Sequence, residues 1–277
     1  MRVGYLGPPG TFSEEAVSRC DLAAGGEAVP FPTFGDAYRA LRRGEVDAAL
    51  LPIENSIEGS VGATLDLLVG EPGPLIRREV LLPVRQHLLA RAGTRLQDVT
   101  RVLSHPQPFG QCSRFLRDDL PGAVLEPMLS TADAARKVAA GEPGAAAIGS
   151  AAAAKRYGLA FLAESIQDVD ENVTRFVLVT GSDEAPTGRD RTSIAFTLDR
   201  DRPGGLYEVL GEFAERGLNL SKVESRPMKE SLGHYVFYLD FEAHREEPAA
   251  AKALAGVRAR VDRLWMLGSS PRASAPA

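Results

Sequence analysis

Apolar and polar residues alternate along the first 180 positions in a pattern that predicts strands and helices in turn. The runs 46–53 and 145–150 are short and apolar, as expected of buried strands, and stretches with helical spacing of apolar residues flank them. Thr11 and Glu14 have the spacing of a capping box, so we expect a helix directly after the first strand. This alternation is typical of the α/β class, in which helices cover the faces of a sheet.

The same region is expected to form two lobes. The extended apolar stretch 79–91 is interrupted by Pro83 and leads away from the first strands. The chain then returns, so the predicted lobes are about 1–76 plus 160–180, and 77–159, joined by a double crossover.

A polar segment at 181–191 contains Gly, Pro and Asp without apolar periodicity, so it is the predicted linker and the first domain, 1–180, ends before it. Beyond it, residues 192–268 are expected to form strand, helix, strand, strand, helix and strand, which is the ferredoxin-like βαββαβ order. The expected elements are 191–199, 204–217, 220–226, 233–243, 248–263 and 264–268. The Ser-, Pro- and Ala-rich stretch 269–277 is the predicted flexible tail.

Composition narrows the function classes. A net charge of −5, from 32 basic and 37 acidic residues, and the scattered positions of the basic residues argue against nucleic-acid binding. Two cysteines and four histidines without HxH or HxxxH spacing predict neither a disulfide framework nor a metal site. No apolar run approaches the length of a membrane span, and the chain begins in a strand rather than a signal peptide, so we expect a cytoplasmic protein without a membrane partner.

Two motifs follow predicted strands. GPPGTFSEEA, 7–16, joins a strand to a helix whose N-terminus suits a carboxylate or phosphate, although a plain strand–helix joint has the same pattern. PIENSIEGSVG, 52–62, places Glu54, Asn55 and Ser56 at the carboxyl end of a strand, where open α/β sheets bind ligands. An Asx turn with a helix cap would explain single residues of that run but not all of them.

Two further motifs carry hydrogen-bonding and charged side chains. SHPQPFGQC, 104–112, is expected to be a loop stiffened by two prolines, and His105 in it is either a general acid or a structural hydrogen bonder. ENVTRF, 171–176, places Asn172, Thr174 and Arg175 at the mouth of a buried strand. That arrangement fits either a satisfied strand end or a small anionic substrate.

These four motifs, in this order, resemble those of the prephenate dehydratase family. Residues 192–268 resemble the ACT regulatory domain that follows the catalytic domain in that family, and ESRP is present as 224–227. Residues 204–207 read GGLY where the family usually has GALV, so Tyr207 is a departure that bears on the effector site. The resemblance covers nearly the whole chain except the tail. No helix bundle resembling a chorismate mutase precedes it, so a monofunctional enzyme is expected.

The resemblance implies a decarboxylating dehydration of prephenate to phenylpyruvate in phenylalanine biosynthesis. It implies a catalytic domain of two lobes, like a type II periplasmic binding protein, with the site in the cleft and no metal or organic cofactor. It further implies feedback inhibition by L-phenylalanine bound between paired ACT domains, in a homodimer or homotetramer, which would be allostery between two distinct sites.

The resemblance also assigns roles to residues. By this match, Thr174 is the expected catalytic donor to the departing hydroxyl. From their own chemistry, Arg175 is the expected carboxylate ligand through a forked contact, and His105 is the alternative acid. The remaining expected substrate-site residues are Thr11, Glu54, Asn55, Ser56, Ser104, Gln111 and Phe176, of which Glu54 would orient Asn55 or Arg175. The expected effector-site residues are Gly204, Gly205, Leu206, Asn219, Glu224, Ser225, Arg226 and Pro227.

Two other functions stay open at this point. A close variant would act on arogenate, which carries an amino group in place of the keto group. A third reading is a non-catalytic, two-lobed sensor of small anions. Such a sensor would not need the hydroxyl of Thr174, so Thr174→Val separates it from the enzymes. Separately, Arg175 could have a structural role, in a surface ion pair with Asp170 or Glu171.

Overall fold

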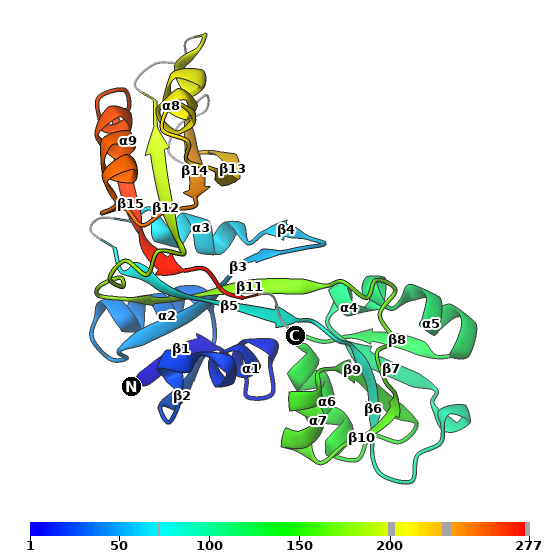
Figure 1. Ribbon diagram of the computed structural model, residues 1–277. Coiled ribbons are helices and arrows are strands. Elements are labelled where there is room, and N and C mark those ends of the chain that lie inside the picture. Colours follow the sequence, from blue (N-terminus) through cyan, green and yellow to red (C-terminus); the bar gives the residue numbers. More distant parts are fainter. Residues whose placement is uncertain (71–72, 199–202, 229–233, 275–277) are drawn as a thin grey trace. The chain divides into compact units, whose positions relative to one another are not determined.

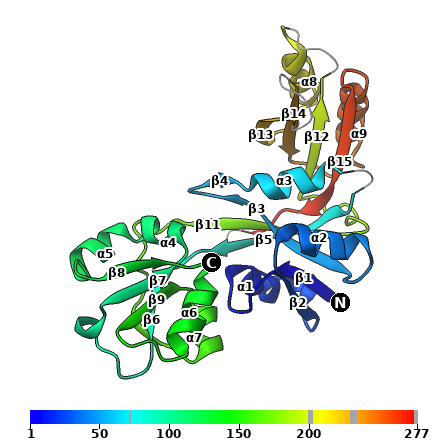
Figure 2. The ribbon, with the colours of Figure 1, turned by 180° about the vertical axis from the view of Figure 1, so that it is seen from behind.

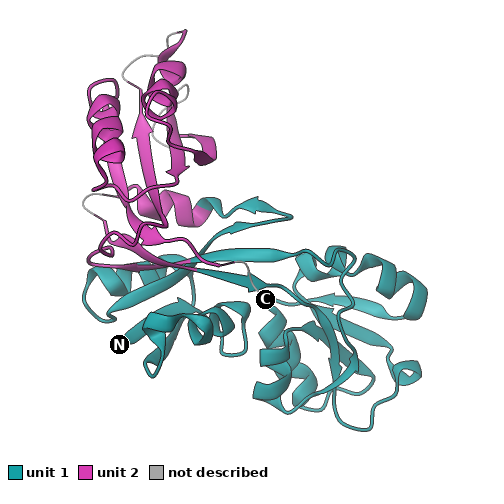
Figure 3. Ribbon diagram, viewed as in Figure 1, with its two compact units in different colours: residues 1–62, 80–176, 275–277 teal, residues 63–79, 177–274 magenta. Residues whose placement is uncertain are grey.

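The computed structural model describes residues 1–70, 73–198, 203–228 and 234–274. Within it the chain divides into two compact units (Figure 3). The first unit holds residues 1–62 and 80–176, and the second holds 63–79 and 177–274. No helix in these described ranges is long and apolar enough to cross a membrane.

The first sheet has the strand order β2-β1-β3-β11-β5, with a short hairpin strand, β4, paired to β3 (Figure 1). Its strands are β1 Arg2–Leu6, β2 Glu27–Phe31, β3 Ala48–Asn55, β4 Gly59–Ser60, β5 Leu75–Pro83 and β11 Val173–Thr180. The helices of this part are α1 Phe12–Arg19, α2 Phe34–Arg42 and the single turn η1 Asp21–Ala23. The start predicted for α1 is confirmed, because the hydroxyl of Thr11 accepts from the backbone N–H of Glu14.

The second sheet, order β10-β6-β9-β7-β8, belongs to the first unit and has helices on both faces (Figure 2). Its strands are β6 His87–Ala90, β7 Arg101–Ser104, β8 Val124–Pro127, β9 Ala145–Gly149 and β10 Ala160–Ala163. Its helices are α4 Pro106–Gln111, α5 Ser113–Asp119, α6 Thr131–Ala139, α7 Ala151–Tyr157 and the turn η2 Leu96–Asp98. Leu88 packs on the α5 side and Leu89 on the α6–α7 side, as strand alternation requires.

Two expectations for this part were wrong. The segment 104–112 is not a loop, because Pro106–Gln111 is helical and Pro106 occupies the first turn, where its missing N–H is not needed. The chain also leaves the second sheet later than predicted. Residues 160–163 pair with β6 as β10, and the return to the first sheet begins with Val173.

The predicted βαββαβ order of the C-terminal part is confirmed, with the antiparallel sheet order β13-β14-β12-β15. Its elements are β12 Asp190–Thr197, α8 Gly205–Ala214, β13 Leu220–Pro227, β14 Tyr235–Phe241, α9 Pro248–Arg258 and β15 Arg263–Pro271. Phe196, Phe213 and Phe241 form the centre of the core between this sheet and the two helices.

Helix α3, Gly62–Leu68, is part of the second unit from Ala63 onward, although its sequence precedes the second sheet. The hydroxyl of Tyr238 donates to the carbonyl of Leu65 over 3.2 Å, and Tyr238 is buried. By strand alternation, Tyr238 lies on the face of β14 opposite Phe237 and Leu239, which pack in the helix-covered core. Helix α3 therefore contacts the other face of the C-terminal sheet.

The ends of this sheet also differ from expectation. In the predicted linker, Asp183 accepts hydrogen bonds from the N–H of Ser269 at 3.0 Å and from Arg245 at 2.9 Å. Ser269 and Ser270 are buried in β15, because they pair with β12, so the tail does not begin at 269. Residues 275–277 of that predicted tail lie outside the described part of the chain.

The carboxylate of Asp168 holds the start of α5. It accepts from the hydroxyl of Ser113 at 2.6 Å and from the N–H of Arg114 at 3.1 Å. Partial burial opposes ionisation, but the hydrogen bonds from Ser113 and Arg114 outweigh it, so the pKa of Asp168 lies below its usual value.

We expect Asp168→Ala to lower the free energy of unfolding near neutral pH by about 1 kcal/mol, the usual loss for a helix cap. The folded-state pKa is depressed, so this stabilisation is present above the ordinary aspartate value of about 4 and is lost as the pH falls through the folded-state value. Urea titrations at neutral pH and at about pH 3 measure the difference. The control is Asp118→Ala, whose exposed carboxylate pairs with Arg117; an equal loss there would contradict the prediction.

Candidate active site

A pocket of about 500 Å³ lies in the first unit, and both of its sheets contribute to the walls. The first sheet supplies Asn55 from the end of β3 and Thr174 from β11. The second supplies His105 from the start of α4 and Ser130 from the start of α6. The pocket thus lies where strand ends and helix starts of two sheets meet, a usual position for a ligand site.

Alternation along β11 decides which side chains of the TRF motif reach the pocket. Thr174 and Phe176 line it, whereas Arg175, between them, does not. Successive side chains of a strand point to opposite faces, so the guanidinium lies on the other side of the sheet. The motif therefore presents one hydroxyl and one aromatic ring to a ligand.

The guanidinium of Arg175 is buried and donates to a carboxylate oxygen of Glu54 over 3.1 Å. Glu54 also lies outside the pocket lining, since its neighbour Asn55 occupies the pocket face of β3. Neither Asp170 nor Glu171, the partners considered from the sequence, makes this ion pair. The geometry thus agrees with the view that Glu54 orients Arg175, and it gives no support for a carboxylate contact by Arg175.

The two polar residues after Glu54 have different positions. The side chain of Asn55 lines the pocket, and its amide nitrogen lies 2.9 Å from the hydroxyl oxygen of Thr174. The hydroxyl of Ser56 donates to the carbonyl of Glu171 and accepts from the N–H of Val173, so it fastens the turn to the start of β11. Ser56 is absent from the pocket lining.

The motif at α4 contributes four lining residues, which are His105, Gln107, Pro108 and Gln111. Nδ1 of His105 accepts from the N–H of Gln107 at 3.3 Å, which makes His105 the N-cap of the helix. Gln111 also lines the pocket, and its side-chain oxygen lies 3.4 Å from the amide nitrogen of Gln86. Ser104 is fully buried outside the lining and donates to the carbonyl of Ile148.

Thr11 lies at the start of α1 but outside the pocket, because its hydroxyl donates to the carbonyl of Leu6 while it caps the helix. Its neighbour Phe12 lines the pocket instead. The first glycine-rich motif is held against the second sheet's helices, since Tyr157 donates to the carbonyl of Pro9 and Ser150 to that of Gly10.

The sequence analysis missed polar lining residues such as Gln86 and Ser130, and it gave no role to Gln107 of the motif 104–112, which lines the pocket as well. Ser130 caps α6 and accepts from the N–H of Asp133, a spacing that a search for capping patterns would have found. Gln86 has no such signal, because only the fold brings it near Gln111. Asn172 was noted at the strand mouth, and it also lines the pocket.

Among the described residues that line the pocket there is no Arg or Lys, and Glu58 is the single Asp or Glu. Positive potential comes from the backbone, because the eight-residue α1 and the nine-residue α6 begin at the pocket with Phe12 and Thr131. An anion held here would therefore be bound by neutral donors and by helix N-termini. No group of three or more His, Cys, Asp or Glu side chains within the described ranges is placed to hold a metal ion.

The expected effector residues lie in the second unit, at the start of α8, directly before β13 and along β13. Gly204 caps α8 with φ of +86°, a left-handed conformation that favours glycine, and Tyr207 is 79 % exposed. Asn219 precedes β13, and its carbonyl accepts from the N–H of Glu242. The other expected effector residues at the start of α8 are Gly205 and Leu206.

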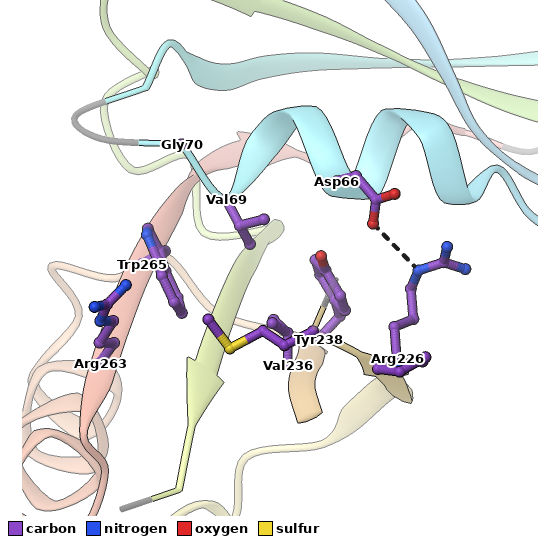
Figure 4. A pocket seen from close by; sticks show the side chains of 10 residues that line it. Asp66, Val69, Gly70, Arg226, Val236, Tyr238, Arg263 and Trp265 are labelled. Atoms are coloured by element: carbon purple, nitrogen blue, oxygen red, sulfur yellow. Dashed lines mark ion pairs between the residues drawn. The ribbon is translucent and has the colours of Figure 1, made fainter. Parts of the chain in front are cut away.

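The ESRP strand reaches a separate cavity of about 250 Å³ (Figure 4). Arg226 and Pro227 line it, and the guanidinium of Arg226 lies 3.5 Å from the carboxylate of Asp66 on α3. Glu224 is on the same face of β13 as Arg226 and pairs with Lys222, whereas Ser225 alternates to the opposite face.

Comparisons with known proteins agree over nearly the whole chain. A family model for prephenate dehydratase matches residues 3–184, and one for the ACT domain matches 192–259. A prephenate dehydratase of Amycolatopsis methanolica is 45% identical over 98% of this chain and 89% of its own length.

Two solved structures are similar as well. A prephenate dehydratase of Arthrobacter aurescens, solved in complex with L-Phe, has a TM-score of 0.91 and 39% identity, covering 98% of this chain and 90% of that one. A protein described as a novel type of quorum quenching acylase, GqqA, has a TM-score of 0.88 and 29% identity, covering 99% and 98%.

Proposed function

Because this chain belongs to the prephenate dehydratase family of carbon–oxygen lyases, we propose that the pocket around Thr174 converts prephenate to phenylpyruvate. The observation that carries the proposal is the Thr174 hydroxyl on the pocket wall, next to the Phe176 ring. The identities of 45% and 39% to the Amycolatopsis and Arthrobacter dehydratases exceed the 29% to the acylase-named relative, which favours this substrate.

The proposed reaction breaks two bonds of prephenate. As CO₂ departs, the electron pair of its bond to the ring enters the ring. The ring hydroxyl then leaves as hydroxide and takes the electron pair of the C–O bond with it. Phenylpyruvate, CO₂ and hydroxide account for all atoms and for both negative charges. The departing oxygen therefore gains from a hydrogen-bond donor, and in this proposal the hydroxyl of Thr174 donates a hydrogen bond to it while keeping its own hydrogen. Such a donor is typically worth about 3–4 kcal/mol in the transition state.

The other lining groups suit the rest of this substrate. Its two carboxylates would meet the starts of α1 and α6 and the amides of Gln86, Gln107 and Gln111, without a paired cation. His105 remains the alternative proton donor, since it lines the same pocket. The ring of Phe176 would pack beside the substrate ring.

We further propose that L-phenylalanine inhibits the enzyme through the C-terminal domain. The ACT family match and the L-Phe complex of the Arthrobacter relative support this effector. Gly204 and Gly205 allow close approach of a ligand to the backbone at the start of α8, and paired copies of the domain would complete the site. The proposed assembly is a cytoplasmic homodimer or homotetramer.

The test is turnover of prephenate by the purified protein with and without L-phenylalanine, followed by the alkaline absorbance of phenylpyruvate. We expect turnover that L-phenylalanine suppresses. Turnover without suppression would overturn the effector proposal alone and direct attention to Tyr207. No turnover by folded protein would overturn the substrate assignment, and arogenate would then be the next compound to test. Conversion of chorismate would contradict the expected single activity.

A further inference from the structure

The orientation of the Asn55 side chain is fixed by its own turn. Its carbonyl oxygen Oδ1 accepts from the N–H of Ile57 and from the N–H of Glu58, both at 3.0 Å. Both donors are backbone N–H groups, which cannot accept, so the atom facing them must be the amide oxygen of Asn55 and not its nitrogen. The amide nitrogen Nδ2 must therefore point away from the turn, toward β11.

Nδ2 has two hydrogens, and two acceptors lie close to it. Oδ1 of Asn172 is 2.7 Å away and Oγ1 of Thr174 is 2.9 Å away, with the carbonyl of Val173 at a longer 3.4 Å. An amide nitrogen donates and does not accept. The hydroxyl oxygen of Thr174 is therefore the acceptor in its contact with Asn55, and both hydrogens of the amide are used inside the protein.

This direction determines what the Thr174 hydroxyl can do. A threonine hydroxyl has a single hydrogen, and it is not spent on Asn55, because Asn55 donates. That hydrogen is left to point into the pocket that Thr174 lines. Accepting a hydrogen bond also polarises an O–H group, which makes it a better donor.

From this geometry we infer that Asn55 is a positioning residue, which acts on the reaction by holding the Thr174 hydroxyl as a donor toward the departing oxygen. The sequence analysis expected Asn55 to contact the substrate instead. Both hydrogens of its amide are used by Asn172 and Thr174, so none is left to donate to a substrate. Asn172 completes the arrangement, because its carbonyl oxygen takes the second hydrogen of Asn55. The inference rests on the proposed function, since it concerns the same leaving oxygen.

The test compares the wild type with Asn55→Ala, Thr174→Val and the double variant, in prephenate turnover. We expect Asn55→Ala to lower kcat by about 10- to 100-fold with KM changed less than about threefold, because it removes orientation rather than binding. In the Thr174→Val background the same change should alter kcat by less than about twofold, since residues acting as a unit are not additive. Losses that multiply would show a direct contact with substrate and overturn the inference.

A second variant guards against disturbance of the turn. Asn55→Asp keeps an oxygen for the N–H groups of Ile57 and Glu58, but its carboxylate has no hydrogen to give to Thr174. We expect low kcat near neutral pH and recovery relative to wild type as the pH falls and the carboxyl becomes a donor. A ratio to wild type that does not change with pH would contradict the inference. Absence of wild-type turnover would overturn the proposed function and this inference with it.

Discussion

Replacing Thr174 with valine should lower kcat for prephenate by about 100- to 1000-fold, the usual effect of losing one preorganised donor to a leaving oxygen. Valine keeps the shape of the side chain and has a methyl group where threonine has the hydroxyl. The amide of Asn55 keeps its contact with Asn172 at 2.7 Å, so the pocket wall should stay in place. KM should change little, because the hydroxyl gains its importance in the transition state.

Steady-state kinetics and a binding titration with a non-reactive dicarboxylate measure the two effects separately. The matched control is Thr174→Ser, which retains the hydroxyl and should retain most of the activity. Near wild-type turnover by Thr174→Val would contradict the role of Thr174 and would make His105, which lines the same pocket, the preferred donor. Conversely, a wild type that binds but does not turn over would favour the non-catalytic sensor.

The second large effect is expected on stability. Arg175→Ala should lower the free energy of unfolding by about 2–4 kcal/mol, because it removes a buried guanidinium and its hydrogen bond to Glu54. The side chain of Glu54 is 41% exposed, so its charge stays partly solvated when Arg175 is removed. We therefore expect a smaller loss of stability than the largest seen when a fully buried ion pair is broken. The KM of the folded variant should be close to that of wild type.

Urea unfolding and kinetics below the unfolding transition test this expectation, with Glu54→Gln as the control that should lose less stability. The sequence hypothesis, in which Arg175 grips a substrate carboxylate, makes the opposite forecast. It requires a large rise in KM with little change in unfolding. That pattern would show that the guanidinium leaves Glu54 when substrate binds.

Much of the fold is encoded in local patterns. The capping residue Thr11, the buried strand from Phe176 onward and the βαββαβ order after 190 were all predicted from spacing alone. The helix at 106–111 was missed because two prolines and a glycine suggest a loop, yet prolines are tolerated in a first turn.

The candidate site was predicted less completely, since it depends on distant pairs. Asn55 and Thr174 are 119 positions apart, and no pattern in the sequence predicts their contact. The placement of Arg175 away from the pocket follows from alternation with Thr174 and Phe176, so that feature was available in the sequence once the strand was recognised. The contact of Gln86 with Gln111 could not be predicted from the sequence, because only the folded second sheet brings the two residues together.

The contact of Leu65 and Asp66 with Tyr238 and Arg226 has a consequence for protein engineering. A fragment cut at the linker and carrying only 192–268 would lack α3, and Tyr238 would lose the cover that keeps it 2% exposed. We therefore do not expect the ACT domain to be transferable on its own as residues 192–268. A chimera with the ACT domain of another protein should also take α3 from that protein. Alternatively, the sheet face of the introduced domain must be redesigned to pack against α3 of this chain. Over evolution, the two stretches are expected to change together rather than as independent modules.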